Sequence, residues 1–199
     1  IINYTNVCIT YCKFCAFYRP PGHEEAYVRS KDEIFRKIEE MLRFKGTTVM
    51  LQGGHNPDLK IDYYEDLFSS VKARFPEVYL HSLTATEVDQ MALHSGLELE
   101  ETLIRLKQAG LDSLPGGGAE MLIDEIRTKV SPLKTSADRW FEVHEIAHKL
   151  GMQSTATMVF GFGENNQQRI AHLERLRELQ DRTGGFRSFI HWSLTPDYT

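Results

Sequence analysis

Three cysteines lie close together near the start of the chain, at Cys8, Cys12 and Cys15. No other cysteine occurs among the 199 residues, and an odd number of cysteines cannot pair completely. Thiols that share a short loop more often converge on a metal than form ordinary structural disulfides. A chain with this cysteine usage is typical of a compartment that keeps thiols reduced, so we expect a cytoplasmic protein.

The number of cysteines also limits which metal group they could hold. Structural zinc sites usually take four protein ligands in two separated pairs, and here there is one group of three. A [4Fe–4S] cluster normally takes four thiolates, so three would leave one iron open to an exogenous ligand. Two alternatives remain at this point: a zinc knuckle completed by His23 or His55, and a ferredoxin-like carrier, which the missing fourth cysteine disfavours.

The loop that carries these cysteines resembles the cluster loop of the radical SAM superfamily. It has the spacing Cys-x3-Cys-x2-Cys, an aromatic residue (Phe14) directly before Cys15, and a position just after the first predicted strand. The resemblance implies a [4Fe–4S] cluster on Cys8, Cys12 and Cys15, with S-adenosylmethionine bound to the open iron. It also implies reductive cleavage of that cofactor to a 5′-deoxyadenosyl radical, which abstracts a hydrogen atom.

Further blocks resemble one family within that superfamily, the cyclic dehypoxanthine futalosine synthases of menaquinone biosynthesis. They occur in order at residues 3–7, 16–22, 51–54, 109–120 and 161–164. The resemblance implies cyclisation of dehypoxanthine futalosine, with a one-electron reductant such as flavodoxin or ferredoxin. The alternatives are a sibling enzyme (aminofutalosine synthase or the F420 deazaflavin synthase subunit) and a non-catalytic metal-binding fragment.

The rest of the chain alternates short β-rich segments with amphipathic helical ones, a pattern that indicates βα units and a parallel sheet. We therefore predict an α/β fold, a partial radical SAM (β/α) barrel of about six units, with its functional loops on one face. Strands are predicted at 1–7, 47–51, 78–83, 111–114, 154–160 and 186–190. Helices are predicted at 31–44, 63–75, 99–109, 119–130, 137–150 and 167–182.

Composition narrows the partners and the domain organisation. The net charge is −5 and the chain has no basic stripe, so we expect no nucleic-acid partner. No segment approaches the ~18 apolar residues of a membrane span, so we expect no membrane partner. One radical SAM core domain is expected over residues 1–199. Because the resembling family is longer, we expect this to be a central fragment that lacks N- and C-terminal parts.

Cofactor-binding residues are predicted in the loops that follow the strands. Gln52, Gly53 and Gly54 end the second strand, where glycines let the backbone approach a small ligand. By resemblance, this loop binds the amino group of the methionyl moiety. Ser82 and Thr84 end the third strand and would direct hydroxyls toward the mouth of the barrel.

Other candidates have two interpretations each. Glu87 has the spacing of a capping box with Thr84, which we favour over a ligand contact. Glu120 follows three glycines, where relatives place a SAM-binding polar group, although a position at a helix start would also favour an acidic residue. Thr157 would face adenosine or belong to the core. Asp112, inside a strand, could reach either ligand.

The remaining basic residues and histidines are given simpler interpretations. His55 would touch substrate or cap the next segment. Arg127 and Lys134 could meet a substrate carboxylate, but we expect them to be exposed. His144 and His148 lack a third ligand, so we expect surface or packing roles.

Overall fold

The strands of this computed structural model, which describes residues 1–195, form one row that follows the order of the chain. They are β1 (Ile2–Asn3), β2 (Thr48–Val49), β3 (Leu51–Gln52), β4 (Tyr79–Leu80), β5 (Ser113–Leu114), β6 (Gln153–Phe160) and β7 (Phe186–Ser193). β2 and β3 are two halves of one extended segment, so the row contains six strand positions. Within the described residues, β1 and β7 do not pair with each other.

Every pairing in this row is parallel. β1 pairs with β3, β2 with β4, and β5 with β6 and β6 with β7. A parallel bridge between His81 and Ser113 continues the row from β4 to β5. Parallel neighbours in chain order, each joined by helical crossovers, make a (β/α) barrel wall that is not closed. This confirms the predicted partial barrel of about six units.

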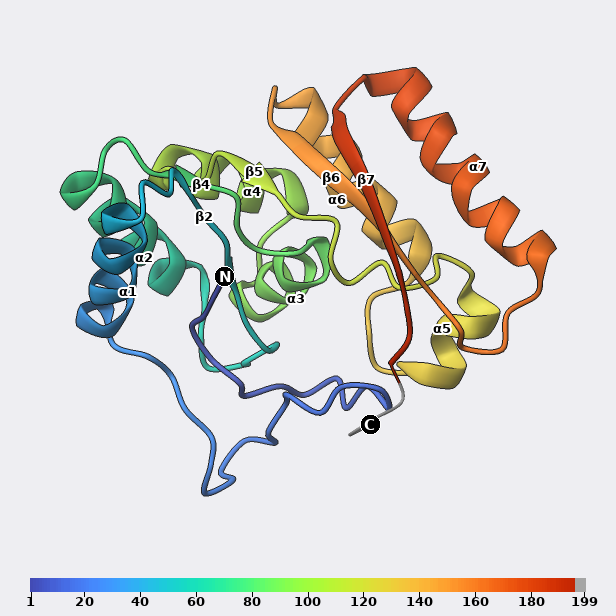
Figure 1. Ribbon diagram of the computed structural model, residues 1–199, viewed down its shortest axis with the longest axis horizontal. Helices are drawn as coiled ribbons and strands as arrows, with labels where there is room; N and C mark the ends of the chain where they lie inside the picture. Colours follow the sequence, from blue (N-terminus) through green and yellow to red (C-terminus); the bar gives the residue numbers. More distant parts are fainter. Residues whose placement is uncertain (196–199) are drawn as a thin grey trace.

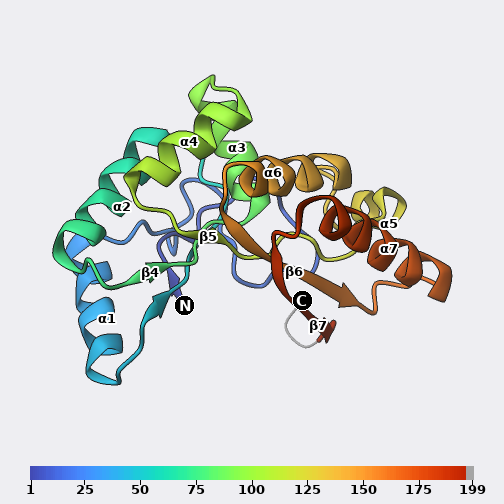
Figure 2. The ribbon, with the colours of Figure 1, turned by 90° about the horizontal axis from the view of Figure 1, so that it is seen from above.

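The helices line the outer side of this curved wall (Figure 2). They are α1 (Lys31–Arg43), α2 (Ile61–Arg74), α3 (Ala85–Ser95), α4 (Leu99–Ala109), α5 (Asp124–Val130), α6 (Ala137–Lys149) and α7 (Asn166–Thr183). The carboxyl ends of the strands point to the lower side of Figure 1, where the segment after β1 runs toward α5. No helix in the described part is long and apolar enough to cross a membrane.

Two helices differ from the prediction. The predicted helix at 119–130 begins only at Asp124, so Glu120 lies in a loop and not at a helix start. Backbone geometry explains this, because Gly118 and Glu120 have φ values of +78° and +43°, outside the right-handed helical region. The prediction also omitted α3, whose first turn is closed by the capping box of Thr84 and Glu87.

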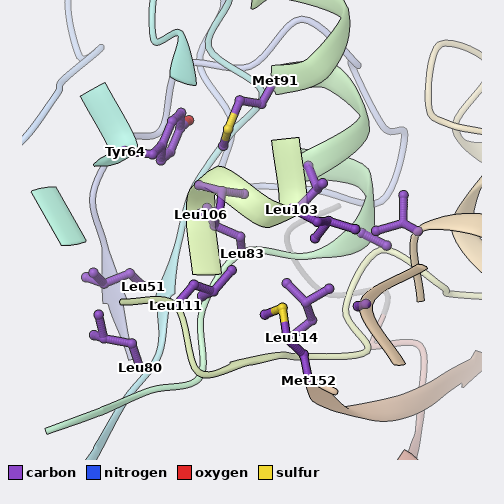
Figure 3. Packing of buried hydrophobic residues seen from close by; sticks show 14 of the residues in the cluster. Leu51, Tyr64, Leu80, Leu83, Met91, Leu103, Leu106, Leu111, Leu114 and Met152 are labelled. Atoms are coloured by element: carbon purple, nitrogen blue, oxygen red, sulfur yellow. The ribbon is translucent and has the colours of Figure 1, made fainter. Parts of the chain in front are cut away.

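The larger of two apolar clusters fills most of the space between the wall and its helices (Figure 3). The strands contribute mainly leucines, which pack against aliphatic and aromatic side chains from α2, α3 and α4. Because these side chains are almost completely buried, their removal from water holds the loops at the carboxyl ends in fixed positions. The labelled members are Leu51, Tyr64, Leu80, Leu83, Met91, Leu103, Leu106, Leu111, Leu114 and Met152.

His144 and His148 lie in a second aromatic region, behind β6 and away from the cysteines. The His144 ring is fully buried, 4.0 Å from the ring centre of Trp140, and neither of its nitrogens has a partner within the described residues. His148 pairs with the hydroxyls of Ser154 and Thr183, each at 2.7 Å. These are packing residues, as the sequence indicated, although they are buried and not on the surface.

Burial of these histidines makes stability depend on pH. Burial lowers the pKa of His148 from 6.5 to about 4 and that of His144 well below its ordinary value. The unfolded chain therefore binds more protons below pH 6.5, so stability present above that pH is lost as the pH falls toward 4. We expect His144→Phe to stabilise the fold by about 2 kcal/mol more at pH 5 than at pH 8.

Thermal unfolding at the two pH values measures this difference, which amounts to roughly 4–8 °C for a chain of this size. The exposed His23 provides the control, because His23→Phe removes a histidine whose ring remains in solvent. If His144→Phe changed the unfolding temperature equally at pH 5 and pH 8, His144 would not be a buried neutral histidine that destabilises the fold at low pH.

Candidate metal and cofactor site

All three cysteines line one cavity of about 360 Å³ at the carboxyl ends of the strands. Cys8 and Cys12 are buried, and Cys15 is partly exposed. The Thr10 hydroxyl lies 3.0 Å from Cys8 Sγ and 3.5 Å from Cys12 Sγ, so it orients both thiols. The loop is anchored at its far side, where the Lys13 amide donates to the Val130 carbonyl at 2.9 Å.

These residues fit a three-thiolate cluster site. The donors are soft thiols that share one cavity, and the sequence contains no further cysteine to occupy a fourth position. His23, one proposed partner for zinc, accepts a hydrogen bond from the Glu25 amide at 3.1 Å and is exposed. Within residues 1–195, no group of three or more His, Cys, Asp or Glu side chains is arranged to hold a single metal ion.

The loop after β3 forms the wall of the cavity next to the cysteines. Gln52, Gly53 and Gly54, the predicted cofactor-binding residues, all line it. A Cβ on Gly54 would lie 2.2 Å from the Val7 carbonyl oxygen and 2.8 Å from Cys8 Cβ. Only glycine lets these two loops approach so closely, and the requirement is one of space.

Gly54→Ala should therefore displace the start of the cysteine loop. We expect a loss of about 2 kcal/mol in stability, as for other overpacking changes, together with lower iron incorporation on anaerobic reconstitution. Gly22→Ala is the control, since it adds a strained methyl group with no atom within 4 Å. Iron content measured per chain should fall for Gly54→Ala alone. Equal iron content in both variants would show that this close approach does not position the cysteines.

The other predicted contacts divide into those at the cavity and those away from it. Phe14, Thr84 and Glu120 line the cavity. Ser82 does not, because its hydroxyl accepts from the Leu51 amide at 3.0 Å within the sheet. Thr157 is also outside the lining, and its hydroxyl donates to the Gly116 carbonyl at 2.5 Å. Both side chains join neighbouring strands instead of facing the cavity.

Asp112 lies away from the cavity as well. It precedes β5, and its carboxylate pairs with Lys72 at 2.6 Å and accepts from the Leu80 amide at 2.7 Å. These contacts tie α2 and β4 to the start of β5. Asp112, which the sequence left undecided, is therefore engaged with Lys72 and Leu80 away from the cavity.

Arg127 is buried and Lys134 is mostly shielded at the cavity, with side chains 4% and 10% exposed, contrary to the expectation that both are exposed. Lys134 Nζ lies 2.9 Å from Glu120 Oε1, and Arg127 Nη1 lies 3.7 Å from Glu120 Oε2. Lys134 also lies over the Phe14 ring, 5.6 Å from its centre. Burial lowers the pKa of Lys134, but the charges of Glu120 and Cys12 outweigh this and leave it above its usual value.

Arg127 holds the backbone that places Glu120. Its guanidinium donates to the carbonyls of Gly118, Ala119 and Thr135, with Nη1 3.1 Å from the first oxygen and Nε 3.2 Å from the third. The loop that follows the three glycines is therefore fixed by a buried cation. The sequence analysis expected Arg127 to be exposed, because nothing in its position on α5 marks it as a partner of the preceding loop.

A second loop reaches the cysteine loop from β6. Glu164 accepts hydrogen bonds from the amides of Gly161 and Phe162 and from Arg169. These hydrogen bonds fold the loop so that the centre of the Phe162 ring lies 5.1 Å from the centre of the Phe14 ring. The aromatic pair covers one side of the cysteine loop.

Comparison with known proteins agrees with this arrangement. A model described as the Radical SAM superfamily matches residues 2–176. The chain belongs to the radical SAM superfamily. Members of this superfamily are enzymes that bind a [4Fe–4S] cluster and S-adenosylmethionine.

Curated radical SAM relatives named cyclic dehypoxanthine futalosine synthase match the whole chain. The protein of Halalkalibacterium halodurans is 50% identical over 100% of this chain and 54% of its own length. The protein of Streptomyces coelicolor is 49% identical, and the match covers 98% of this chain and 49% of that protein. Aminodeoxyfutalosine synthase of Thermus thermophilus is 41% identical, and the match covers 98% of this chain and 53% of that protein. The predicted resemblance is confirmed, and the chain spans about half the length of the curated relatives it matches.

Solved radical SAM structures share the fold. The FeFe-hydrogenase maturase of Carboxydothermus hydrogenoformans has a TM-score of 0.70 at 18% identity, covering 98% of this chain and 44% of that one. A Streptococcus suis protein whose structure holds S-adenosylmethionine has a TM-score of 0.64 at 12% identity. The match covers 97% of this chain and 40% of that protein. At these identities the comparison supports the fold alone.

Proposed function

We propose that this chain is the radical SAM core, over residues 1–199, of an enzyme that cyclises dehypoxanthine futalosine in menaquinone biosynthesis. The observation that carries the proposal is the cavity itself, in which three thiols face the Gln52–Gly54 loop. Support for this substrate over others comes from the relatives of that name, which are 50% and 49% identical to the chain.

In this proposal, the residues on each wall of the cavity have a separate binding role. Cys8, Cys12 and Cys15 would hold the [4Fe–4S] cluster, with S-adenosylmethionine bound beside it. Together these groups would supply radical chemistry when reduced. The Gln52–Gly54 loop would receive the methionyl end of the cofactor, because Gly53 and Gly54 carry no Cβ atoms and so allow close approach.

The charged side of the cavity orients the remainder of the cofactor. Glu120 keeps a buried carboxylate oxygen, Oε2, that has no hydrogen-bond partner among the described residues. A buried acceptor of this kind is costly unless a ligand donor reaches it, so we assign it to a hydroxyl of the nucleoside. Lys134 and Arg127 hold Glu120 in place, and Phe14 and Phe162 keep water from the cysteine loop.

We also propose that a one-electron reductant such as flavodoxin or ferredoxin reduces the enzyme, and that it acts in the cytoplasm. Position and exclusion of water are the contributions of the protein, while the bound groups carry the difficult chemistry.

A substrate comparison tests the proposal. The anaerobically reconstituted protein is reduced with S-adenosylmethionine present, and products are followed by mass spectrometry. Dehypoxanthine futalosine should give a product lighter by two hydrogen atoms, with 5′-deoxyadenosine formed alongside. Turnover of the substrate of aminodeoxyfutalosine synthase instead would assign the chain to that sibling, whose Thermus thermophilus member is 41% identical.

A further inference from the structure

Six buried side chains form a continuous hydrogen-bonded series along one wall of the cavity. The series joins the loop after β3, the N-terminus of α3, the residue that follows β1, and α2, which are distant in sequence. Four of its members also line the cavity: His55, Thr84, Thr86 and Glu87. In order, the series is His55, Thr86, Thr84, Glu87, Tyr4 and Tyr64.

The direction of these hydrogen bonds is set by Glu87. Its Oε1 accepts from the Tyr4 hydroxyl at 2.7 Å and the Gly53 amide at 2.9 Å. Its Oε2 accepts from the amide and the hydroxyl of Thr84, both at 2.8 Å. Four donors occupy both oxygens, which is the arrangement of an ionised carboxylate that only accepts.

From Glu87 the direction follows step by step to His55. The single hydroxyl proton of Thr84 is used on Glu87, so Thr84 Oγ1 must accept from Thr86, 3.0 Å away. Thr86 Oγ1 in turn must accept from His55 Nε2, 3.1 Å away. A neutral imidazole carries one proton, so His55 holds it on Nε2 and presents a lone pair at Nδ1.

That lone pair has no partner in the structure. His55 is 7% exposed, and its Nδ1 is a buried atom without a hydrogen bond among the described residues. Burial and the nearby Lys134 ammonium lower the pKa of His55 to about 3, so the ring stays neutral and keeps its acceptor. An unpartnered acceptor in the wall of a cavity costs free energy that a ligand donor would recover.

We propose that His55 is a ligand-binding residue whose Nδ1 accepts a hydrogen bond from an O–H or N–H group of the nucleoside or amino acid moiety in the cavity. Glu87, Thr84 and Thr86 are positioning residues that fix its tautomer. This inference rests on the proposed function in one respect, that S-adenosylmethionine occupies this cavity. It also explains why the N-cap and first turn of α3 carry three polar side chains that are all buried, Thr84, Thr86 and Glu87.

Nitrogen-15 NMR of the reconstituted protein, with labelled histidine, reads the tautomer directly. We expect a protonated-type shift at Nε2 of His55 and an unprotonated-type shift at Nδ1, which moves when ligand binds. S-adenosylmethionine, L-methionine and adenosine serve as separate probes, so that the moiety that donates is identified. His148 is an internal control, because Ser154 and Thr183 already occupy both its nitrogens.

Two variants test the same inference through affinity. His55→Phe removes the acceptor and should weaken S-adenosylmethionine binding by about three- to tenfold. Thr86→Val should give a mixture of tautomers and a smaller loss. Thr102→Val is the matched control, since Thr102 is equally buried but bonds to the Glu98 carbonyl within α4.

The outcomes separate this inference from the proposed function. If S-adenosylmethionine binds while Nδ1 of His55 does not respond and His55→Phe binds normally, only the role of His55 is overturned. If none of the three probes binds to the folded protein, the proposed function fails as well.

Discussion

Replacing Cys12 by alanine should abolish formation of 5′-deoxyadenosine. Cys12 is buried, and its thiol is held by Thr10 toward the cavity that Cys8 and Cys15 also line. With two thiolates left, the loop cannot bind the cluster through three irons. Since changes to outer-shell partners of a metal already cost 10–100-fold, loss of a direct ligand should lower the rate by at least about a hundredfold.

Iron content and the visible absorbance of the reconstituted variant measure the same loss independently of activity. Lys13→Ala is the control, because Lys13 belongs to the same loop, is exposed, and contributes its backbone amide to the contact with Val130. A Cys12→Ala protein with the iron content and turnover of Lys13→Ala would exclude Cys12 as a ligand.

Replacing Arg127 by methionine should strongly destabilise the fold. The side chain of Arg127 is 4% exposed and donates to three backbone carbonyls around the loop that carries Glu120. Methionine would fill similar space but leave these three carbonyls without their donor and remove the cation beside Glu120 Oε2, so that Glu120 keeps the ion pair with Lys134 alone among the described residues. Removing one member of a buried ion pair costs about 3–5 kcal/mol, and we expect a loss in that range.

Denaturant unfolding measures the loss, and Lys129→Met is the matched control on the same helix. Lys129 pairs with Glu125 at 3.1 Å, but both side chains are about two-thirds exposed, at 64% and 66%. Such surface pairs contribute about 0–1 kcal/mol. Equal losses in the two variants would show that Arg127 does not hold the loop.

The fold and the cysteine site were predictable because their signals are local. Alternation of strands and helices identifies βα units, and three thiols with fixed spacing in one loop identify a cluster site. The Gln52–Gly54 loop was found in the same way, since glycines directly after a strand indicate close approach to a ligand. Each of these signals lies within a few consecutive residues.

The charged and hydrogen-bonded parts of the site were not predictable to the same extent. Arg127 and Lys134 were expected to be exposed, since a basic residue alone gives no sign that the chain will fold it against a carboxylate such as Glu120 and away from solvent. Glu87 was correctly assigned to a capping box, but its bonds to Tyr4 and Gly53 depend on segments more than 30 residues away.

A position near the end of a strand was not enough to predict whether a single side chain faces the cavity. Ser82 and Thr157 both follow the pattern of residues near the carboxyl end of a barrel strand. Their hydroxyls instead satisfy backbone groups of neighbouring segments, at Leu51 and Gly116. Alternation along a strand predicts which way a residue faces only when the register and the end of the strand are known.

Low-temperature electron paramagnetic resonance of the reduced, reconstituted protein, with and without S-adenosylmethionine, tests the central claim most directly. We expect the signal of a reduced [4Fe–4S] cluster that changes shape when S-adenosylmethionine is added, because the cofactor binds the iron that Cys8, Cys12 and Cys15 leave open. A protein with stoichiometric zinc and no such signal, or a cluster signal that S-adenosylmethionine leaves unchanged, would contradict it.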